Sequence, residues 1–504
     1  MPLSPVIGAL ILTAAVVAGM ASVDARDGAE AVQPGWERSY EAGYTDSRGH
    51  YAGGSEVLHL VGHKGKLYAG VSYWFDPRNI WYGGKDASTG WGQILRLDDP
   101  HGQWEVDLEM GPQHLRPEIV KSVTITTDGK GNPLKEPADL LMVSTYTPKP
   151  TAVDINVFIR DDETGDWDRA TLLTGPRPRN LEDRSVRDIH VHRDRATGVD
   201  RIFISIGTLG LFSGVYDPAA PEKIRWGTKS ESGPVGTRPL AIIEANGSLL
   251  FSAGSRIYRR NDGESPTYAV VYDAAETPSD SVRSPVGGIR GMSAIPNPSG
   301  RGESILFAWA PGNRSRGCIY RLDPNGRGGY TRTEEVCLDS LMTDYLDGNP
   351  VYFVLAGYND MLPAVDPSTG ETVHLIGFES WIGGHRFHTA QRKENGGFYA
   401  GGMYAVRDSD EDYRLNEVNG PSTPGKPPLV ATRAYALSPF EGEENRFIYF
   451  GGNDCNEAFH SPNWAWIFRT SLANALRKDA SRPRRLGTEK TKAMIRGMGE
   501  PDPE

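Results

Sequence analysis

The sequence ILFAWAPG (Ile305–Gly312), followed by IYRLD (Ile319–Asp323), decides the fold. Both stretches read as short strands, because apolar and β-branched residues run up to small residues or to an aspartate. The first member recurs as LYAG (Leu67–Gly70), LLMVST (Leu140–Thr145), IFISIG (Ile202–Gly207), LLFSAG (Leu249–Gly254), FYAGG (Phe398–Gly402) and FIYFGG (Phe447–Gly452). The second recurs as QILRLDD (Gln93–Asp99), VFIRDD (Val157–Asp162), GVYD (Gly214–Asp217), IYRR (Ile257–Arg260), YAVRD (Tyr404–Asp408) and WIFRT (Trp466–Thr470). A strand pair that returns along the chain predicts a repeat architecture.

The turns between these strands favour an all-β fold. Among 504 residues, 59 are Gly and 36 are Pro, and short strands with such turns are typical of a β-propeller, whose blades are four-stranded sheets around a channel. We divide the body into units that begin at Ser55, Lys121, Arg187, Arg238, Arg290, Asn349, Arg386 and Arg433. The unit at Asn349 lacks a clear Tyr-Arg-x-Asp strand, so the prediction is a single propeller of seven or eight four-stranded blades.

The two ends of the chain have separate roles in this prediction. The aromatic stretch Gly35–Asp46 precedes the first full unit and is expected to close the ring as the outer strand of the last blade. We therefore assign the propeller to residues 35–473 and a charged, flexible tail to residues 474–504. Residues 1–23 contain no charge and Val6–Ala18 is apolar or small, so residues 1–25 are expected to be a secretory signal peptide, although a basic residue is missing from its start. An uncleaved N-terminal anchor is the alternative. The protein is thus expected to be secreted or periplasmic, with no other segment apolar enough to span a membrane.

Charge and cysteine content limit the partners. The net charge of −11 argues against nucleic-acid binding, which needs a basic surface. Cys318 and Cys337 are expected on successive strands of one blade and could form a cross-strand disulfide, as an exported protein permits. Cys455 would then remain single, and three buried thiols are the alternative.

A basic residue recurs just before or at the start of the first strand of most units. The positions are Lys121, Arg187, Arg238, Arg290, Arg386 and Arg433. In a propeller the first strand of each blade lines the channel, so these cations would ring its mouth and attract a small anionic ligand, such as an anionic saccharide. The alternative is that each basic residue pairs with a carboxylate of a neighbouring blade and has a structural role.

The 11 histidines include candidates for proton transfer and metal binding. His190 and His192 lie two residues apart on an expected strand, so both face one side of it. That spacing fits a general base or, with Asp454, a divalent metal ion, which is the cofactor that the sequence leaves open. His388 is a second candidate base. The alternative for each is a packed, hydrogen-bonded histidine.

Tyr, Trp, Asn and Asp gather in the loops expected around the channel mouth. Trp74 lies in the most aromatic of these loops, Tyr358 and Asn359 lie in GYND, and Asn453 lies in GGNDCNEAFH. Aromatic faces with polar tips stack on sugar rings and hydrogen-bond their hydroxyls. Packing between blades is the alternative role. The sequence contains no established catalytic or nucleotide-binding string.

The repeats resemble those of secreted β-propeller proteins of the broad YVTN/kelch-like kind, and at the level of the fold the chain is similar to propeller polysaccharide lyases. That resemblance implies β-elimination on a uronate, with an Arg such as Arg187, Arg290 or Arg386 at the carboxylate and His190, His388 or Tyr358 as the base. Because one fold serves many functions, two alternatives stay open. One is a non-catalytic propeller that binds a glycan or a protein, and the other is a metal-assisted hydrolase.

Overall fold

The structure is a computed structural model that describes part of the chain. The described residues are 32–73, 90–220, 222–275, 287–312, 317–326, 328–345, 351–382, 398–399, 402–408, 411–420, 429, 431–453 and 463–478. The predicted signal peptide and most of the predicted tail lie outside these ranges. Among the described residues, no helix has the length and apolarity that a membrane span requires.

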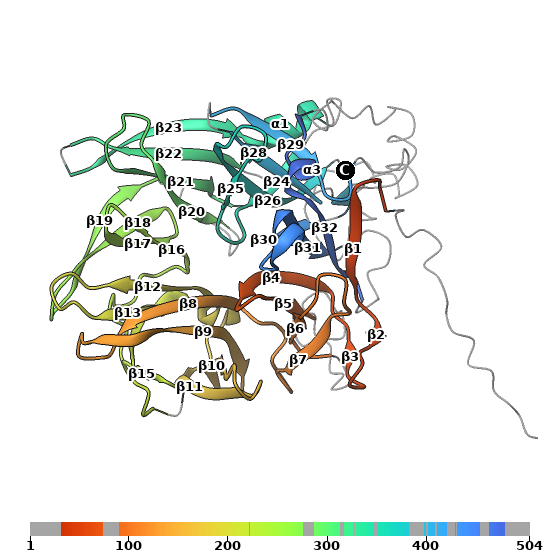
Figure 1. Cartoon of the computed structure of the whole chain (residues 1–504). Coiled ribbons are helices and arrows are strands. Elements are labelled where there is room, and N and C mark those ends of the chain that lie inside the picture. The colour runs from red at the N-terminus through yellow and green to blue at the C-terminus, as the bar shows by residue number, and fades with distance from the viewer. Residues whose placement is uncertain are drawn as a thin grey trace, which may run out of the picture. The chain divides into compact units, whose positions relative to one another are not determined.

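Five antiparallel sheets have four strands each, in chain order from the inside outward (Figure 1). Blade 1 contains β4 (Glu56–His63), β5 (Lys66–Ser72), β6 (Gln93–Leu97) and β7 (Glu105–Glu109). Blade 2 contains β8 (Ile119–Thr127), β9 (Pro133–Pro148), β10 (Ala152–Arg160) and β11 (Trp167–Pro176). Blade 3 contains β12 (Val186–Arg193), β13 (Asp200–Ile206), β14 (Gly210–Tyr216) and β15 (Ile224–Trp226). Blade 4 contains β16 (Pro239–Ala245), β17 (Ser248–Ala253), β18 (Arg256–Asn261) and β19 (Thr267–Asp273). Blade 5 contains β20 (Gly288–Pro296), β21 (Glu303–Ala310), β22 (Cys318–Pro324) and β23 (Tyr330–Cys337).

Blade 6 has interrupted strands. Its long second strand, β26 (Thr372–Ile382), pairs on one side with β24 (Val351–Ala356) and β25 (Leu362–Val365), which together form one inner strand. On the other side β26 pairs with β27 (Phe398–Tyr399) and β28 (Met403–Arg407), and β29 (Tyr413–Glu417) is outermost. The units predicted to begin at Asn349 and Arg386 are therefore one blade.

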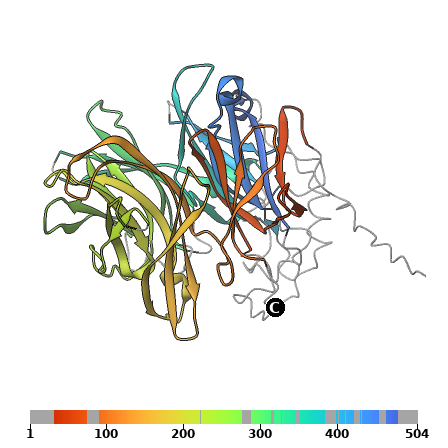
Figure 2. The same cartoon turned by 60° about the horizontal axis from the view of Figure 1, so that its bottom comes forward.

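Blade 7 joins the two ends of the chain. It contains β30 (Ala431–Leu437), β31 (Phe447–Asn453) and β32 (Ala465–Ser471), and its outer strand is β1 (Trp36–Glu41), which pairs antiparallel with β32. In Figure 2 the red N-terminal strand accordingly lies beside the blue strands. The prediction that the stretch from Gly35 closes the ring is confirmed, and the described strands account for seven four-stranded blades.

Short elements complete the described chain. They are the hairpin of β2 (Tyr44–Thr45) and β3 (Tyr51–Ala52), the helices α1 (Leu338–Tyr345) and α3 (Leu472–Ala475), and the 3-10 turns Leu181–Arg184, Gly207–Leu209 and Gly442–Arg446.

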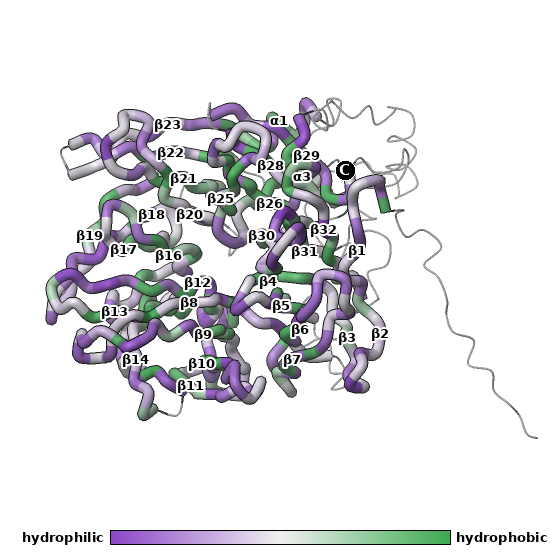
Figure 3. The backbone as a smooth tube through the Cα atoms, viewed as in Figure 1, coloured by the Kyte–Doolittle hydropathy of each residue, from purple (hydrophilic) through white to green (hydrophobic). Residues whose placement is uncertain are grey.

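Apolar side chains fill the junction between each blade and the next. Seven buried clusters join blades 1 and 2, 2 and 3, 3 and 4, 4 and 5, 5 and 6, 6 and 7, and 7 and 1 among the described residues. Figure 3 shows the corresponding change from hydrophobic strand residues to hydrophilic turns. Because each blade buries both faces against its neighbours, the ring is closed by the hydrophobic effect as well as by β1.

The repeated Arg of the third strands forms buried ion pairs between blades. Arg96 of blade 1 and Arg160 of blade 2 both bind Asp107 on β7, and Asp107 is 1% exposed. Glu335 on β23 likewise binds Arg321 of blade 5 at 2.8 Å and Arg407 of blade 6 at 2.6 Å. A carboxylate on an outer strand thus links the Arg of its own blade to the Arg of the next.

The aspartate two residues after the repeated Arg extends this network to the inner strands. Asp162 accepts from Arg160 at 3.0 Å and lies 3.0 Å from Nε2 of His63, at the end of β4. Asp262 stands in the same relation to Arg260 and to His192, whose Nε2 lies 3.1 Å away. The Arg-x-Asp motif therefore makes the same contact at two junctions, between blades 1 and 2 and between blades 3 and 4.

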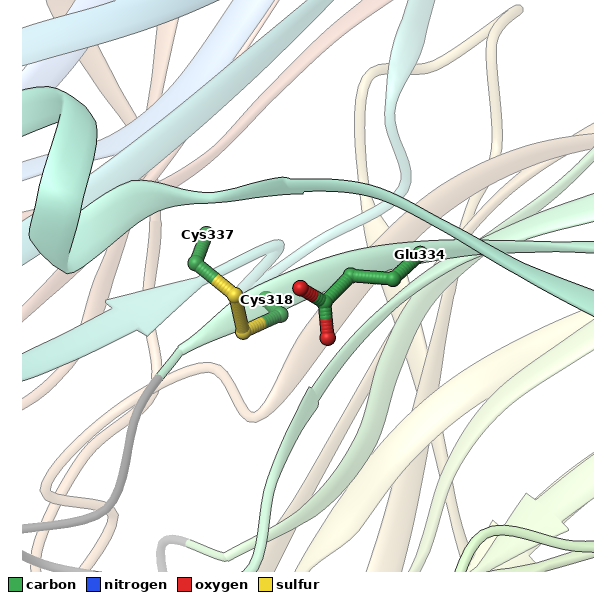
Figure 4. Close-up of side chains that lie close together, drawn as sticks. All are labelled: Cys318, Glu334 and Cys337. Atoms are coloured by element: carbon green, nitrogen blue, oxygen red, sulfur yellow. A yellow bond between two sulfur atoms is a disulfide. The ribbon is translucent and has the colours of Figure 1, made fainter.

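The cysteines agree with the predicted pairing. Cys318 on β22 and Cys337 on β23 are directly opposite in register and form a disulfide (Figure 4). Cys455 lies outside the described residues.

We predict that Asp107→Asn lowers stability by about 3 kcal/mol or more, because it removes the charge that two buried guanidinium groups share. Glu443→Gln is the matched control, since Glu443 and its partner Arg446 are 81% and 70% exposed and such a pair contributes at most about 1 kcal/mol. Urea unfolding followed by tryptophan fluorescence measures both. Equal midpoints for the two variants would contradict a stabilising role for Asp107.

Candidate functional site

An irregularity in the inner strands turns side chains into the channel, which is the space that these strands enclose. The register of the inner and second strands shifts between Val57 and His59, Val186 and Ile189, Pro239 and Ile242, Arg290 and Ser293, and Thr432 and Ala434. Such bulges add residues to one strand and redirect its side chains. Arg187, Arg290 and Arg433 lie at these places, so the repeated Arg position coincides with a repeated bulge.

In blade 6 the corresponding interruption is much longer. Pairing with β26 stops at Ala356 and resumes at Leu362, and the five residues between, Gly357–Met361, enter the channel. We call this segment the plug. Gly357 has a φ of +59°, and a Cβ on Gly291 would lie 2.9 Å from the Cα of Gly357, so these two positions require glycine.

The plug is hydrogen-bonded to several other blades. The Asn359 Nδ2 group donates to the carbonyl oxygens of Leu58 in blade 1, at 2.7 Å, and Arg433 in blade 7, at 2.8 Å. The Tyr435 hydroxyl donates to the carbonyl of Asp360, and the Ser293 hydroxyl donates to that of Met361. The two Asn359 bonds satisfy carbonyl groups at the bulges of β4 and β30, and the other two satisfy carbonyl groups of the plug itself. Together they hold the plug across the channel.

Tyr358 of the plug lies among three guanidinium groups. Arg187 donates to its hydroxyl oxygen at 2.5 Å. The guanidinium carbons of Arg187, Arg290 and Arg433 lie 5.3, 5.7 and 4.4 Å from the centre of its ring. This geometry suits cation–π attraction and brings three of the predicted basic positions together.

Carboxylates accompany these arginines. Glu182 binds Arg187 at 3.0 Å, Arg116 at 2.8 Å and also Arg238. Burial alone would raise the pKa of Glu182, but the charges of Arg116, Arg238 and Arg187 outweigh burial and hold that pKa below its usual value.

Arg433 and Arg290 differ in their surroundings. Arg433 contacts Glu379 at 2.7 Å and Glu56 at 3.3 Å. Burial, together with the nearby charges of Arg238 and Arg187, lowers the pKa of Arg290 to about 9. Four of the predicted basic residues are thus ion-paired, as the structural alternative expects: Arg187, Arg238, Arg433 and also Lys121, which contacts Asp188 and Asp360. The charges of the three arginines meet in the channel and not at the blade surface.

A cavity of about 430 Å³ lies on one side of the plug. Its lining includes Arg187, Tyr358, Asn359, Lys121, Asp188 and Asp360, together with apolar residues of β4, β8, β25 and β30. Gly62, Ser122, Pro363 and Leu437 line it and are exposed, whereas His59 and Asp188 are buried. The cavity therefore opens where the inner strands end. The sequence placed the mouth where they begin, and for the described cavity that prediction is wrong.

Lys121 lies between two carboxylates in this cavity. Its Nζ contacts Asp360 of the plug and lies 3.4 Å from Asp188. Asp188 also accepts the backbone N–H groups of Ile189, at 2.8 Å, and Ile242, at 2.6 Å. Burial raises the pKa of Asp188 to about 7, although the charge of Lys121 opposes the shift.

The predicted site residues fall into groups. Lys121, Arg187, Tyr358 and Asn359 line the cavity. Arg238, Arg290 and Arg433 belong to the cluster behind Tyr358, where Arg290 and Arg433 reach its ring. Trp74, Arg386, His388 and Asp454 lie outside the described residues. Arg386 was expected on an inner strand, but β24 and β25 take that place in blade 6, and residue 386 falls between β26 and β27.

The remaining predicted residues have different surroundings. Burial, with a smaller effect of Lys121, lowers the pKa of His190 to about 4, and the cavity lining does not include this residue. Both ring nitrogens of His192 face carboxylates, Glu244 at 2.8 Å and Asp262 at 3.1 Å. Asn453 is buried, and neither atom of its side-chain amide has a hydrogen-bond partner among the described residues.

The described residues bring together one potential metal-binding group. It consists of Cys318, Glu334 and Cys337, and the disulfide removes its two thiols as ligands (Figure 4). His190 and His192 do not form such a group with any described acidic residue.

Sequence reasoning missed Arg116, Glu182 and Asp188. Arg116 lies three residues before the first residue of β8, whereas Arg238 lies directly before β16, so an alignment on the strands could have found Arg116 only by allowing for this offset. Asp188 follows Arg187 directly and becomes a channel residue through the bulge. Glu182 lies in a 3-10 turn between blades 2 and 3, where no repeated pattern marks it.

Comparisons with known proteins give likenesses to solved structures only. No family model and no curated protein sequence matches the chain. An α-L-arabinofuranosidase of Fusarium graminearum in complex with arabinobiose is 10% identical, with a TM-score of 0.42 over 88% of this chain and 99% of the other. An α-L-arabinanase of Penicillium chrysogenum, also with arabinobiose, is 9% identical, with a TM-score of 0.41 over 87% and 98%. A protein of unknown function from Dyadobacter fermentans is 12% identical, with a TM-score of 0.35 over 87% and 100%. We take no residue role from these likenesses.

We predict that Asp188→Asn gains stability relative to the wild type as the pH rises. Because the pKa of Asp188 is raised in the folded state, its contribution to stability is fully present below the pKa of the unfolded chain and is lost as the pH rises through about 7. Asparagine cannot ionise and avoids that loss. Melting temperatures between about pH 5 and about pH 8 measure the difference, with Glu443→Gln as control. A constant difference between Asp188→Asn and the wild type would show that Asp188 does not titrate in this range.

Proposed function

We propose that the protein is a carbohydrate-active enzyme that cleaves a uronate-containing saccharide by β-elimination in the cavity beside the plug. The observation that carries this proposal is the position of Tyr358. Its hydroxyl accepts from Arg187 at 2.5 Å, and Tyr358 and Arg187 line the same cavity as Lys121. A proton-transfer group flanked by cations is the arrangement that elimination next to a carboxylate requires.

The roles follow from the chemistry of the groups. Lys121 and Arg187 would bind the uronate carboxylate and stabilise the negative charge that spreads onto it when the C5 proton leaves. Deprotonated Tyr358 would take that proton, the C5 electron pair would form the C4–C5 double bond, and the C4–O bond would break. Tyr358 would then return the proton to the departing oxygen, so that the protein ends the cycle unchanged.

Among the predicted bases, the geometry favours Tyr358. His190 does not line the cavity, and its lowered pKa of about 4 makes it a weak base near neutral pH. His388 lies outside the described residues. The substrate carboxylate would replace Asp360 at Lys121, and the 44% exposure of the Asp360 side chain is consistent with such an exchange.

A second candidate is a propeller that binds a saccharide without reaction. It is favoured by the acidic groups that accompany the cations of the described channel. The cationic groups are Arg116, Lys121, Arg187, Arg238, Arg290 and Arg433, and the acidic groups are Glu56, Glu118, Glu182, Asp188, Asp360 and Glu379. A channel in which most cations already contact an acidic group can hold a ligand through hydroxyl hydrogen bonds alone.

Two further expectations remain proposals. Metal-assisted hydrolysis at His190, His192 and Asp454 would require His192 to release Glu244 or Asp262, and metal analysis of the purified protein tests it. Export with removal of residues 1–25 is tested by the N-terminal sequence of the mature protein.

We predict that the mature protein raises the absorbance near about 235 nm, where an unsaturated uronate absorbs, with at least one polymer from a panel of uronate polysaccharides. Tyr358→Phe keeps the ring among its guanidinium groups but removes the hydroxyl, so it should lower the rate by about 100-fold or more. Tyr268→Phe is the matched control, because the Tyr268 hydroxyl donates to Glu231 and does not line the cavity.

The outcomes separate the candidates. Full activity of Tyr358→Phe would exclude Tyr358 as the proton-transfer group. Binding of a uronate saccharide without any rise in absorbance would favour the non-catalytic propeller.

A further inference from the structure

We infer that the cavity takes a short saccharide or the end of a chain, and not the middle of a polymer. The inference rests on the proposed function, because it concerns the saccharide that would bind there. It depends on three features of the described residues: the plug, the position of the mouth and the placement of charge.

The plug closes the cavity at one end. Besides the inner strand of its own blade, it contacts blades 1 and 7 through Asn359, blade 2 through the pair of Asp360 with Lys121, and blades 3 and 5 through Tyr358. A segment held to so many inner strands leaves no passage for a sugar chain to continue along the channel past Tyr358. A polymer could therefore enter only from the mouth and would have to stop at the plug.

The size of the cavity agrees with an end-on ligand. Its volume of about 430 Å³ lies near the lower end of the ~300–1,000 Å³ that small-molecule sites occupy. Three of the four exposed lining residues, Gly62, Pro363 and Leu437, lie in the last residues of an inner strand, and the fourth is Ser122. A site that binds the middle of a chain is instead a groove that is open at both ends.

Charge is placed at the closed end. Arg187 contacts Tyr358 of the plug, and Lys121 contacts Asp360 of the plug, so both cations meet the ligand where it stops. Toward the mouth the exposed lining residues are uncharged, namely Gly62, Ser122, Pro363 and Leu437. The terminal uronate of a chain would place its carboxylate beside the plug, and sugars beyond the first few would lie in solvent without contacts that add affinity.

The test measures how affinity depends on chain length and does not require turnover. Isothermal titration calorimetry of the mature protein is carried out with galacturonate, glucuronate and mannuronate oligosaccharides of two to six sugars. We expect the dimer and the hexamer of the preferred series to differ in Kd by no more than about threefold. A gain of about tenfold or more from dimer to hexamer would overturn the inference and leave the proposed function intact.

A variant of the plug tests whether the plug limits the length of the saccharide that binds. Asn359→Ala removes both hydrogen bonds to Leu58 and Arg433, so the ratio of dimer Kd to hexamer Kd should rise by about threefold or more as the closed end loosens. Asn246→Ala is the matched control, because Asn246 also bonds two backbone groups, both of Glu303, in a hairpin outside the cavity lining.

Melting temperatures confirm that both variants are folded. An unchanged ratio in folded Asn359→Ala would count against the plug as the limit. If none of the three series binds, the proposed function fails, and the inference fails with it.

Discussion

The shared carboxylate between two blades is the interaction on which the ring depends. Asp107 and Glu335 each bind the third-strand Arg of their own blade and of the following blade, in places that water barely reaches. Removing charges from water is costly, and the cost is recovered only where several partners with good geometry surround each charge. Apolar packing would let neighbouring blades slide, whereas a carboxylate held by two guanidinium groups fixes their relative position. Because the bulges and the plug lie on the inner strands of these blades, their positions depend on how the blades are fixed relative to one another.

Ion pairs between arginines and carboxylates occur in two different arrangements in this molecule. Near the rim, which here means the third and outer strands, ion pairs of one kind join blade 1 to blade 2 and blade 5 to blade 6. In the channel, the arginines converge from several blades on one glutamate and one tyrosine, Glu182 and Tyr358. The rim pairs follow from a repeated phrase, but the channel cluster depends on single residues that break the repeat. Departures from a repeat are where a symmetric scaffold acquires a specific site.

The sequence predicted the fold well because periodic strands and turns are local signals. The four-stranded blades, the closing strand from Trp36 and the disulfide of Cys318 with Cys337 all follow from patterns along the chain. The sequence prediction divided blade 6 into two units. The spacing of the repeats is irregular there, because the second strand is long and the inner strand is interrupted.

The site was predicted only in part. Lys121, Arg187, Tyr358 and Asn359 do meet at one cavity. The direction of its mouth and the carboxylates that balance its cations could not be predicted, because they depend on contacts between blades that are distant in sequence. Glu182, for example, gathers arginines from the starts of three different blades.

The closing strand also determines when the molecule can be complete. Arg469 on β32 binds Glu37 on β1 across a separation of 432 residues, and the last blade has no outer strand until both segments are present. During synthesis the first blades can form in sequence, but the N-terminal strand must wait beside an open edge until nearly the whole chain has emerged. Ring closure is therefore a late, all-or-none event in the life of each molecule. A chain cut short just before β32 would keep most of its blades and still leave β1 without a partner and one edge of β31 unpaired, and exposed strand edges of this kind favour pairing with other chains.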